Sequence, residues 1–231
     1  MQQGWAVYFE DPVPYEQGVR IQERLVAARM ADKIRDTVLF LEHEPVVTLG
    51  ARGRDEHLLV DRRELARRGI ALAQASRGGD VTYHGPGQLV MYPIMRLGGV
   101  EADSHGYLRN LEEIVIRVAS SWGIRAFRRA GMTGAWTREG KIAAIGIRLR
   151  RWVTFHGLSL NVAPDPTGFE TIVPCGLEGE RVTSLRALLG EACPSVPAVR
   201  ERMREQFADV CGRELTVRSL GALLAQTRAE E

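Results

Sequence analysis

Short apolar runs separated by polar or turn-forming residues predict strands at the start of the chain, with one helix among them. Trp5–Phe9 predicts an opening strand. Residues 15–31 predict a helix, because Pro14 suits a first helical turn and apolar side chains then recur at helical spacing. Val38–Leu41 and Val46–Leu49 predict a strand pair with a short polar interruption between them.

Two further helices are predicted from their capping residues and their periodicity. Asp61 and Glu64 have the spacing of a capping box, and the short helix that they begin should end at Gly69. A longer helix is expected from about Ser104 to Trp122, ending at a glycine. One face of that helix carries Leu108, Leu111, Val115 and Val118.

The second half of the chain predicts a β-meander followed by a loop and a helical tail. The meander covers residues 125–162, with a hairpin turn at Thr137–Lys141. A loop rich in Pro, Asp and Gly runs over residues 163–180. The tail is mostly helical, with a short strand near Glu214–Val217. We therefore expect an α/β (α+β) fold, a mixed sheet flanked by helices, and residues 181–231 leave open a small, mostly helical C-terminal subdomain.

Residues 77–88 form a segment with four glycines, Arg-Gly-Gly-Asp-Val-Thr-Tyr-His-Gly-Pro-Gly-Gln, which we call the glycine loop. Apolar runs at Ile70–Ala75 and Leu89–Ile94 flank it, so the pattern predicts a loop between two strands. Glycine lets the backbone approach a ligand closely, and Pro86 fixes part of the shape. Because long, constrained polar loops are typically functional, a binding role is favoured over an ordinary turn.

Composition excludes several classes of function for these 231 residues. Hydrophobic residues make up 45% and charged residues 26%, which is typical of a globular protein with a sizeable core. The 31 Lys and Arg against 29 Asp and Glu leave a net charge of +2, which gives no argument for a nucleic-acid partner. Neither a signal-peptide pattern nor a membrane-length apolar stretch is present, so a cytoplasmic protein without a membrane partner is expected.

Cofactor and metal motifs are missing as well. The glycine loop lacks the strand–loop–helix context of a dinucleotide site, and the chain has no phosphate-binding loop motif. Three cysteines, with no CxxC pair and no zinc-ligand spacing, argue against disulfides and zinc. We expect no cofactor and no metal. A cofactor-free covalent transferase or hydrolase is therefore the class that the residues favour.

Cys175 is the best candidate nucleophile. It lies between Pro174 and Gly176 in the long irregular loop, a context that can present a side chain outward. Cys193 and Cys211 have the surroundings of packing or surface residues. A nucleophilic cysteine needs a base or a nearby cation to favour its thiolate.

The partner of such a cysteine could be one of several residues. Lys141, one of only two lysines, begins a markedly apolar predicted strand, although its position alone favours a solvated hairpin lysine. His84 in the glycine loop, His156 and, less plausibly, His43 are the other candidates. Strand periodicity does not decide which way His156 points without knowledge of the buried face.

Four segments in this order and spacing make the pattern specific: the glycine loop, Gly140–Gly146, His156–Asn161 and Pro174–Leu177. Together they resemble the octanoyltransferases of lipoate biosynthesis, the lipoyl(octanoyl) transferases, over about residues 35–190. The resemblance implies a fold similar to the catalytic domain of biotin and lipoate protein ligases, and a single catalytic domain over residues 1–231. It also implies transfer of octanoyl from acyl carrier protein to a lysine of lipoyl domains, as the first step of protein lipoylation.

The resemblance also implies roles for individual residues. Cys175 matches the cysteine that becomes an acyl thioester, and Lys141 matches the lysine that activates it. Ser159 stands where many relatives have alanine, which changes no role. The matching substrate-pocket positions are Arg77, Gly78, Gly79, Asp80, Val81, Thr82, Tyr83, His84, Ala144, Ile145, Gly146, Gly157, Leu158 and Ser159. Among them we expect Tyr83, Val81, Ile145 and Leu158 to form the apolar walls of an acyl groove.

The implied partners are acyl carrier protein as the donor and lipoyl domains as acceptors, the latter in 2-oxoacid dehydrogenase complexes and the glycine cleavage H protein. Such partners tend to be acidic, so the arginines at 125, 128 and 129 or at 148, 150 and 151 are candidate docking surfaces. Solvated surface charge is the alternative for both groups.

Three other functions compete with octanoyl transfer. An ATP-dependent lipoate or biotin ligase shares the fold, but it does not need a loop cysteine. A non-catalytic acyl- or lipoyl-domain-binding protein would have no use for Lys141 and Cys175. A cysteine hydrolase is the weakest alternative, because a transferase requires its acyl-enzyme to outlive attack by water.

Overall fold

A large mixed sheet forms the centre of the molecule. The computed structural model describes residues 2–176 and 179–228, except the side chains of Cys175 and Arg228. Within these residues the sheet has eight strands, in the order β11-β1-β2-β6-β10-β9-β8-β7. Their bounds are β1 Gln2–Tyr8, β2 Thr37–Leu41, β6 Gln88–Ile94, β7 Phe127–Arg129, β8 Met132–Thr137, β9 Gly140–Arg150, β10 Val153–Asn161 and β11 Arg213–Val217. The neighbours β11, β1 and β2 are parallel, and the other pairs are antiparallel.

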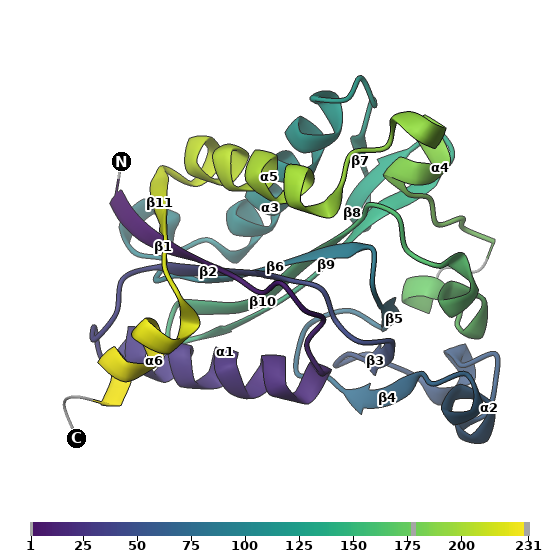
Figure 1. The fold of residues 1–231 in the computed structure, drawn as a ribbon, viewed down its shortest axis with the longest axis horizontal. Coiled ribbons are helices and arrows are strands. Elements are labelled where there is room, and N and C mark those ends of the chain that lie inside the picture. The colour runs from purple at the N-terminus through teal and green to yellow at the C-terminus, as the bar shows by residue number, and fades with distance from the viewer. Residues whose placement is uncertain (1, 177–178, 229–231) are drawn as a thin grey trace.

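Helices cover both faces of this sheet, as Figure 1 shows: α3 and α5 on one face, α1 and α6 on the other. The α-helices are α1 Tyr15–Met30, α2 Arg62–Arg67, α3 Ser104–Ser120, α4 Leu185–Leu189, α5 Val196–Cys211 and α6 Leu220–Arg228. The 3-10 helices are η1 Asp55–His57, η2 Gly99–Glu101, η3 Pro166–Thr171, η4 Pro174–Gly176 and η5 Gly190–Ala192. The predicted mixed sheet flanked by helices is therefore confirmed.

Strand β2 illustrates why the central strands are continuously apolar. Val38 and Phe40 point into the core under α3 and α5, whereas Leu39 and Leu41 point into the core above α1. Successive side chains of a strand face opposite sides of a sheet, and here both sides are covered. All five residues of β2 are consequently buried.

The predicted helix ends and the β-meander are confirmed. Asp61 caps α2 by accepting a hydrogen bond from the Glu64 N–H (2.8 Å), and Gly69 follows with φ +69°. The helix predicted from Ser104 is α3, whose apolar face packs into the core. Strands β7 to β10 form the meander, with the expected turn between Thr137 and Gly140.

A second, smaller sheet corrects two sequence-based expectations. Its strands are β3 Val46–Leu49, β4 Ala71–Gln74 and β5 Val81–His84, in the order β4-β3-β5. The glycine loop is therefore not a continuous loop, because its middle third is the buried strand β5. The expected strand pair is also wrong: β2 belongs to the large sheet and β3 to the small one, and the chain changes sheets at residues 42–45.

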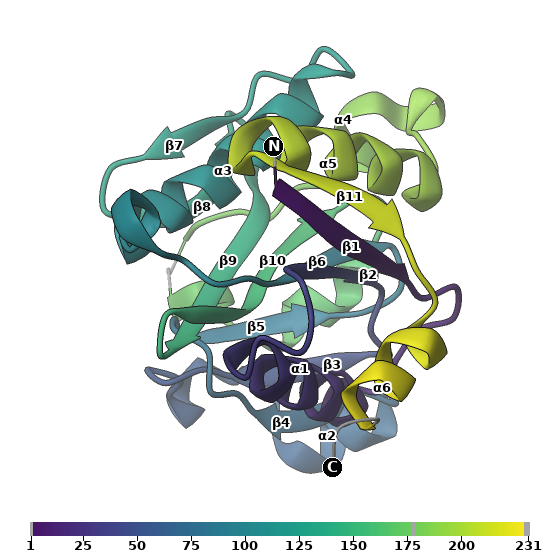
Figure 2. The ribbon, with the colours of Figure 1, turned by 90° about the vertical axis from the view of Figure 1, so that its left-hand side faces the viewer.

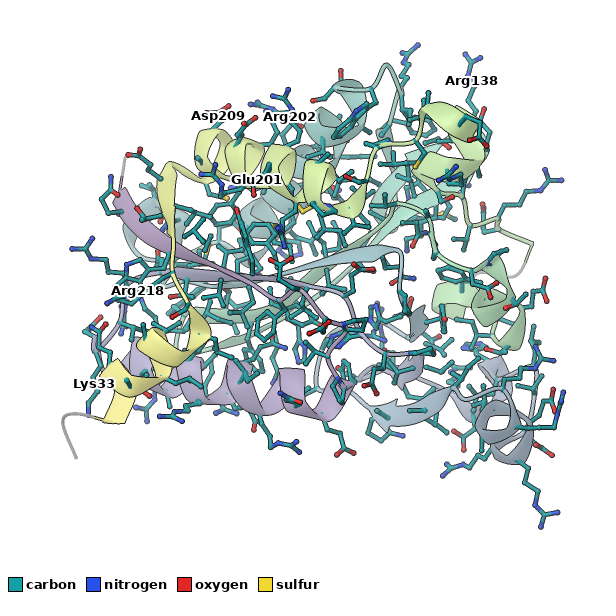
Figure 3. The ribbon with its side chains drawn as sticks, viewed as in Figure 1. Lys33, Arg138, Glu201, Arg202, Asp209 and Arg218 are labelled. Carbon is teal, nitrogen blue, oxygen red and sulfur yellow. The ribbon has the colours of Figure 1, made fainter. Side chains whose placement is uncertain are left out.

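The C-terminal residues lie against the body of the molecule. Strand β11 runs parallel to β1 at one edge of the large sheet, while β7 forms the opposite edge (Figure 2). Helix α5 packs on α3 in the core. Charged side chains on the outside of these elements, such as Arg202 and Asp209 on α5 and Arg138 in the β8–β9 turn, point away from the sheet (Figure 3). In the described part of the chain, each helix is too short or too polar to cross a membrane.

Candidate active site

The main cavity of the molecule, about 490 Å³, opens between the small sheet and strands β9 and β10 of the large sheet. The glycine loop with β5 forms one wall, and β9 and β10 form the wall opposite. The loop at residues 52–57 and the β7–β8 turn complete its rim. Arg52 and Arg54 lie at this rim, so the opening carries positive charge. Cavities of this size accept small-molecule ligands.

Arg77 fixes the shape of the glycine loop. Its guanidinium is buried and donates to the Thr48 carbonyl (2.8 Å), the Thr48 hydroxyl (2.6 Å) and the Asp80 carbonyl (2.8 Å). The first two bonds reach β3, so Arg77 ties the start of the loop to the small sheet. Gly146 on β9 leaves room for it, because a side chain there would meet Arg77 Cδ at 2.9 Å and the Gly78 carbonyl at 2.8 Å.

Three buried histidines lie together at the cavity, and we call His43, His84 and His156 the histidine floor. His84 and His156 line the cavity, and the His43 ring packs behind them, 5.7 Å from the centre of the His84 ring. His43 bonds to the Val13 carbonyl and the Tyr92 hydroxyl, both at 2.8 Å. Burial lowers the pKa of His43 to about 4 and that of His156 to about 3, and it holds the pKa of His84 well below its usual value. All three rings are therefore uncharged at neutral pH.

The sequence could not show how His156 is held. It has φ +56° in the middle of β10, a conformation that non-glycine residues rarely adopt. Its backbone N–H donates to Gln22 Oε1 (2.7 Å), and its Nε2 lies 3.0 Å from the Ser76 hydroxyl. Two contacts hold His156 so that its ring lines the cavity: one with Gln22 on α1 and one with Ser76 beside the glycine loop.

Lys141 is buried rather than solvated, which corrects the expectation from its position alone. Lys141 is only 7% exposed, and its Nζ lies 5.3 Å from the centre of the Trp136 ring. A side chain on Gly134, on the neighbouring strand β8, would meet Lys141 Cε at 2.6 Å. The backbone of Lys141 also pairs with the segment at 181–183, through Lys141 N–H to the Arg181 carbonyl (2.8 Å) and Thr183 N–H to the Lys141 carbonyl (3.0 Å).

The segment Pro174–Gly176, which we call the cysteine turn, lies beside Lys141. Gly176 lines the main cavity together with Lys141. Pro174 and Lys141 also line a small hollow of about 10 Å³ beside that cavity, which we call the narrow passage, together with Thr82, Ala144, Ser159, Asn161, Phe169 and Val182. The backbone of Cys175 is therefore bracketed by two residues that share cavity walls with Lys141. The Cys175 side chain, the predicted nucleophile, lies outside the described residues.

A second cavity, about 450 Å³, lies on the other side of Pro174. Prolines and Phe169 contribute apolar walls, while Glu170, Glu180 and Arg186 contribute charge. The narrow passage shares Phe169, Pro174 and Val182 with this cavity, and it shares Lys141 and others with the main cavity. The cysteine turn therefore lies between the main cavity and the second cavity.

Most of the predicted pocket residues meet at the main cavity. Two do not line it: the Gly78 N–H bonds to the Ile147 carbonyl (2.9 Å), and the Tyr83 ring packs edge-on to Phe169, 5.3 Å away, in the core of the small sheet. Tyr83 alternates with Thr82 and His84 along β5, so it faces away from them. The lining residues are Arg77, Gly79, Asp80, Val81, Thr82, His84, Ala144, Ile145, Gly146, Gly157, Leu158 and Ser159, joined by Lys141.

One pair of titratable residues in this cavity, His57 and Asp80, could not be recognised from the sequence. Their Nδ1 and Oδ2 atoms lie 2.7 Å apart. Asp80 was predicted as a pocket residue, but His57 was not, because it stands in an unremarkable polar stretch 23 positions away. Tyr92 and the 131–133 turn were missed for the same reason: only the fold brings them to the cavity.

The two other cysteines do not have the surroundings of nucleophiles. Burial raises the pKa of Cys211 to about 12, and burial also raises the pKa of Cys193. Cys211 is the last residue of α5 and is buried in the core, whereas Cys193 lies just before α5 and packs, half-buried, against that core; neither lines the main cavity. Among the described residues, no group of three or more His, Cys, Asp or Glu is placed to hold a metal ion.

The described geometry agrees with what comparisons with known proteins show. Residues 14–208 match the lipoyl protein ligase A/B catalytic domain. An octanoyltransferase of Chloroflexus aurantiacus is 47% identical over 217 residues, covering 93% of this chain and 97% of that protein. An octanoyltransferase of Syntrophotalea carbinolica is 45% identical over 195 residues, covering 84% and 89%.

Solved structures show the same fold at low sequence identity. The bipartite lipoate protein ligase of Thermoplasma acidophilum superimposes with a TM-score of 0.79 at 18% identity, covering 99% of this chain and 91% of that one. A lipoate-protein ligase A bound with ATP gives a TM-score of 0.75 at 18% identity, covering 98% and 93%. The fold is therefore that of the lipoate protein ligases. Within this fold, the chain belongs to the octanoyltransferase family and is an acyltransferase.

Proposed function

We propose that this enzyme transfers an octanoyl group from acyl carrier protein to a lysine of lipoyl domains, such as those of 2-oxoacid dehydrogenase complexes and the glycine cleavage H protein. In this proposal Cys175 carries the octanoyl group as a thioester, and Lys141 handles its proton. The observation that carries the proposal is the burial of Lys141 at the cavity wall, beside the backbone of the cysteine turn.

In the first step, Lys141 as an ammonium stabilises the Cys175 thiolate. The thiolate attacks the carbonyl carbon of the octanoyl thioester, a carbon–sulfur bond forms to Cys175, and the bond to the carrier thiol breaks. Lys141 gives its proton to the departing sulfur and becomes neutral. One thioester replaces another, so this step needs no ATP.

In the second step, the amine of the acceptor lysine attacks the Cys175 thioester. An amide forms, Cys175 leaves as a thiolate, and neutral Lys141 accepts a proton from the attacking nitrogen. The amide is more stable than the thioester, which makes this step favourable. Throughout, the octanoyl chain would rest against Val81, Ile145 and Leu158 of the main cavity, where each buried methylene contributes about 0.8 kcal/mol.

The direct test is intact-mass analysis after mixing the protein with octanoyl-acyl carrier protein without ATP. We expect one octanoyl adduct in the wild type and in Cys193→Ala, and none in Cys175→Ala. Adduct formation that requires free octanoate and ATP would instead identify an ATP-dependent ligase. An adduct that persists in Cys175→Ala would refute the assignment of Cys175.

The role of Lys141 is tested by the alkylation rate of Cys175. A stabilised thiolate should react with iodoacetamide at pH 7 at least about 10-fold faster than a free cysteine, whose pKa is about 8.5. Lys141→Ala should remove this advantage, whereas the control Lys33→Ala should keep it. Equal rates in the wild type and Lys141→Ala would contradict the Cys175–Lys141 pairing.

A further inference from the structure

The proposed function leaves one proton without an acceptor. The acceptor lysine arrives as an ammonium with three N–H bonds, and the amide product keeps one of them. Two protons therefore leave the nitrogen in the second step. Lys141 can hold only one, the proton that pairs it again with the Cys175 thiolate. The other proton passes to solvent, either from the ammonium itself or through a second group at the cavity that accepts it first.

We propose that His57, oriented by Asp80, is this second proton acceptor; the inference rests on the proposed function. His57 lines the main cavity, with its Nδ1 2.7 Å from Asp80 Oδ2. The Asp80 carboxylate lies against the Nδ1 side of the ring, and we propose that a small rotation of the ring turns Nδ1–H toward Oδ2 and leaves Nε2 as the acceptor atom. This arrangement of a carboxylate behind a histidine is the one that orients a general base in many hydrolases and transferases.

Asp80 is itself held in place. Its Oδ1 accepts hydrogen bonds from the backbone N–H groups of Val81 (2.7 Å) and Arg54 (3.3 Å). The first belongs to β5 and the second to the rim loop. Asp80 therefore joins the wall and the rim of the cavity, and its other oxygen lies beside the His57 ring, 2.7 Å from Nδ1.

The backbone places this pair next to the proposed thioester. The Val173 N–H donates to the His57 carbonyl (2.9 Å), which ties the chain just before the cysteine turn to His57. Gly176, immediately after Cys175, has φ +65°, and a side chain there would meet His57 Cε1 at 2.7 Å and would also collide with Asp80 Oδ2. His57 thus bonds to the chain two residues before Cys175 and lies close to the residue that follows it.

Access to solvent distinguishes His57 from the histidine floor. Its side chain is 17% exposed, so a proton taken up at Nε2 can pass to water. The charged groups around it are Asp80, the rim arginines Arg52 and Arg54, and Glu56, which pairs with Arg54 at 2.9 Å. His43, His84 and His156 are buried, and their lowered pKa values make them weak bases.

The complete second step then balances. His57 Nε2 removes one proton from the bound ammonium, which gives a neutral amine and an imidazolium beside the Asp80 carboxylate. The amine attacks, its nitrogen–carbon bond forms, the carbon–sulfur bond to Cys175 breaks, and Lys141 takes the second proton. The imidazolium returns its proton to solvent. The enzyme is left with Cys175 as thiolate and Lys141 as ammonium, as it began.

The test compares two nucleophiles on the isolated octanoyl-enzyme, followed by intact mass. A lipoyl domain brings an ammonium, whereas hydroxylamine is already neutral at pH 7 and does not need the second base. His57→Asn keeps an N–H donor for Asp80 but removes the Nε2 acceptor. We expect His57→Asn to react with the lipoyl domain at least about 10-fold more slowly, and with hydroxylamine within twofold of the wild type.

Further variants separate proton transfer from a structural role. Asp80 is a positioning residue, so Asp80→Asn, which keeps an oxygen for the Val81 N–H, should show the same selective loss. Added imidazole should restore part of the rate in His57→Asn, and the exposed control His105→Asn should match the wild type. Equal slowing with both nucleophiles, or no slowing, would overturn the inference and leave the proposed function standing. A wild type that forms no octanoyl adduct would overturn both.

Discussion

At the scale of single residues, the environment of Lys141 depends on a glycine on the neighbouring strand β8. Gly134 on β8 has no side chain, and this leaves the space that the Lys141 stem occupies. The sequence placed Lys141 at the start of a strand but did not reveal its burial. Burial arises from a register shift between β8 and β9 near Ala135, and from the bridge to Val182, 41 positions later.

Replacing Gly134 should therefore disturb the wall of the cavity around Lys141. In Gly134→Ala the new methyl group would meet the Ala143 carbonyl oxygen at 2.5 Å and Lys141 Cε at 2.6 Å, at a residue whose φ of +122° already favours glycine. We expect formation of the octanoyl-enzyme to slow at least about 10-fold, measured by intact mass on protein shown to be folded by circular dichroism. Gly98→Ala, where nothing lies within 4 Å of the added methyl, is the matched control. A folded Gly134→Ala protein with normal rates would contradict this account.

At the scale of elements, the sequence predicted isolated strands and helices better than their partners. Helix caps such as Asp61 act within a few residues, so they can be read locally. The sequence predicts a loop where β5 lies, because this strand has only four residues and glycines stand close to both of its ends. The division of β2 and β3 between two sheets depends on their partners: β2 pairs with β6, about 50 residues further on, and β3 pairs with β5, about 35 residues further on.

Ion pairs join strand β11, near the C-terminal end of the described chain, to elements of the N-terminal half. Arg213 is 2% exposed and donates to Asp36 Oδ2 (2.6 Å) and to Glu101 Oε2 (2.7 Å). Asp36 also accepts from Arg29 on α1 (2.7 Å). This network joins β11 to the beginning of β2, to η2 and to the end of α1.

Removing Arg213 should cost much of the stability of the molecule. In Arg213→Met, two carboxylates lose a buried partner, and breaking such a pair typically costs about 3–5 kcal/mol. Because Arg29 still neutralises Asp36, we expect the lower end of that range in urea unfolding monitored by circular dichroism. The exposed Arg202→Met should change stability by less than about 0.5 kcal/mol. A loss below about 1 kcal/mol for Arg213→Met would show that the network matters little.

At the scale of the whole molecule, the buried histidines link folding to pH. His43 and His156 have pKa values of about 4 and about 3 in the folded protein, against about 6.5 in an unfolded chain. The unfolded state therefore binds more protons below pH 6.5. Their stabilising contribution is complete above that pH and is lost progressively as the pH falls towards 4 and 3.

This linkage predicts a loss of about 2 kcal/mol per histidine between pH 7 and pH 5. The measurement is the free energy of unfolding in urea at several pH values. His43→Asn should be less stable at pH 7 but should lose less stability on acidification, whereas the exposed His105→Asn should follow the wild type. An unchanged pH slope in His43→Asn would contradict the assignment.

The whole-molecule arrangement could be predicted only in part. The pattern of apolar runs and the resemblance together predicted an α/β (α+β) fold with a mixed sheet flanked by helices, and the four matching segments include most of the residues that line the cavity. The His57–Asp80 pair could not be found in this way. It exists only because the rim loop folds back over the glycine loop, and a single histidine in a polar stretch gives no periodic or motif signal.

The uncharged histidine floor has a further consequence for the lifetime of an acylated enzyme. A base whose pKa lies near 3 or 4 pulls weakly on a water proton, so water that enters beside these rings stays a poor nucleophile. These rings would therefore give no base assistance to hydrolysis of an octanoyl-enzyme. The same burial that makes the fold sensitive to acid would keep this part of the cavity from activating water at neutral pH.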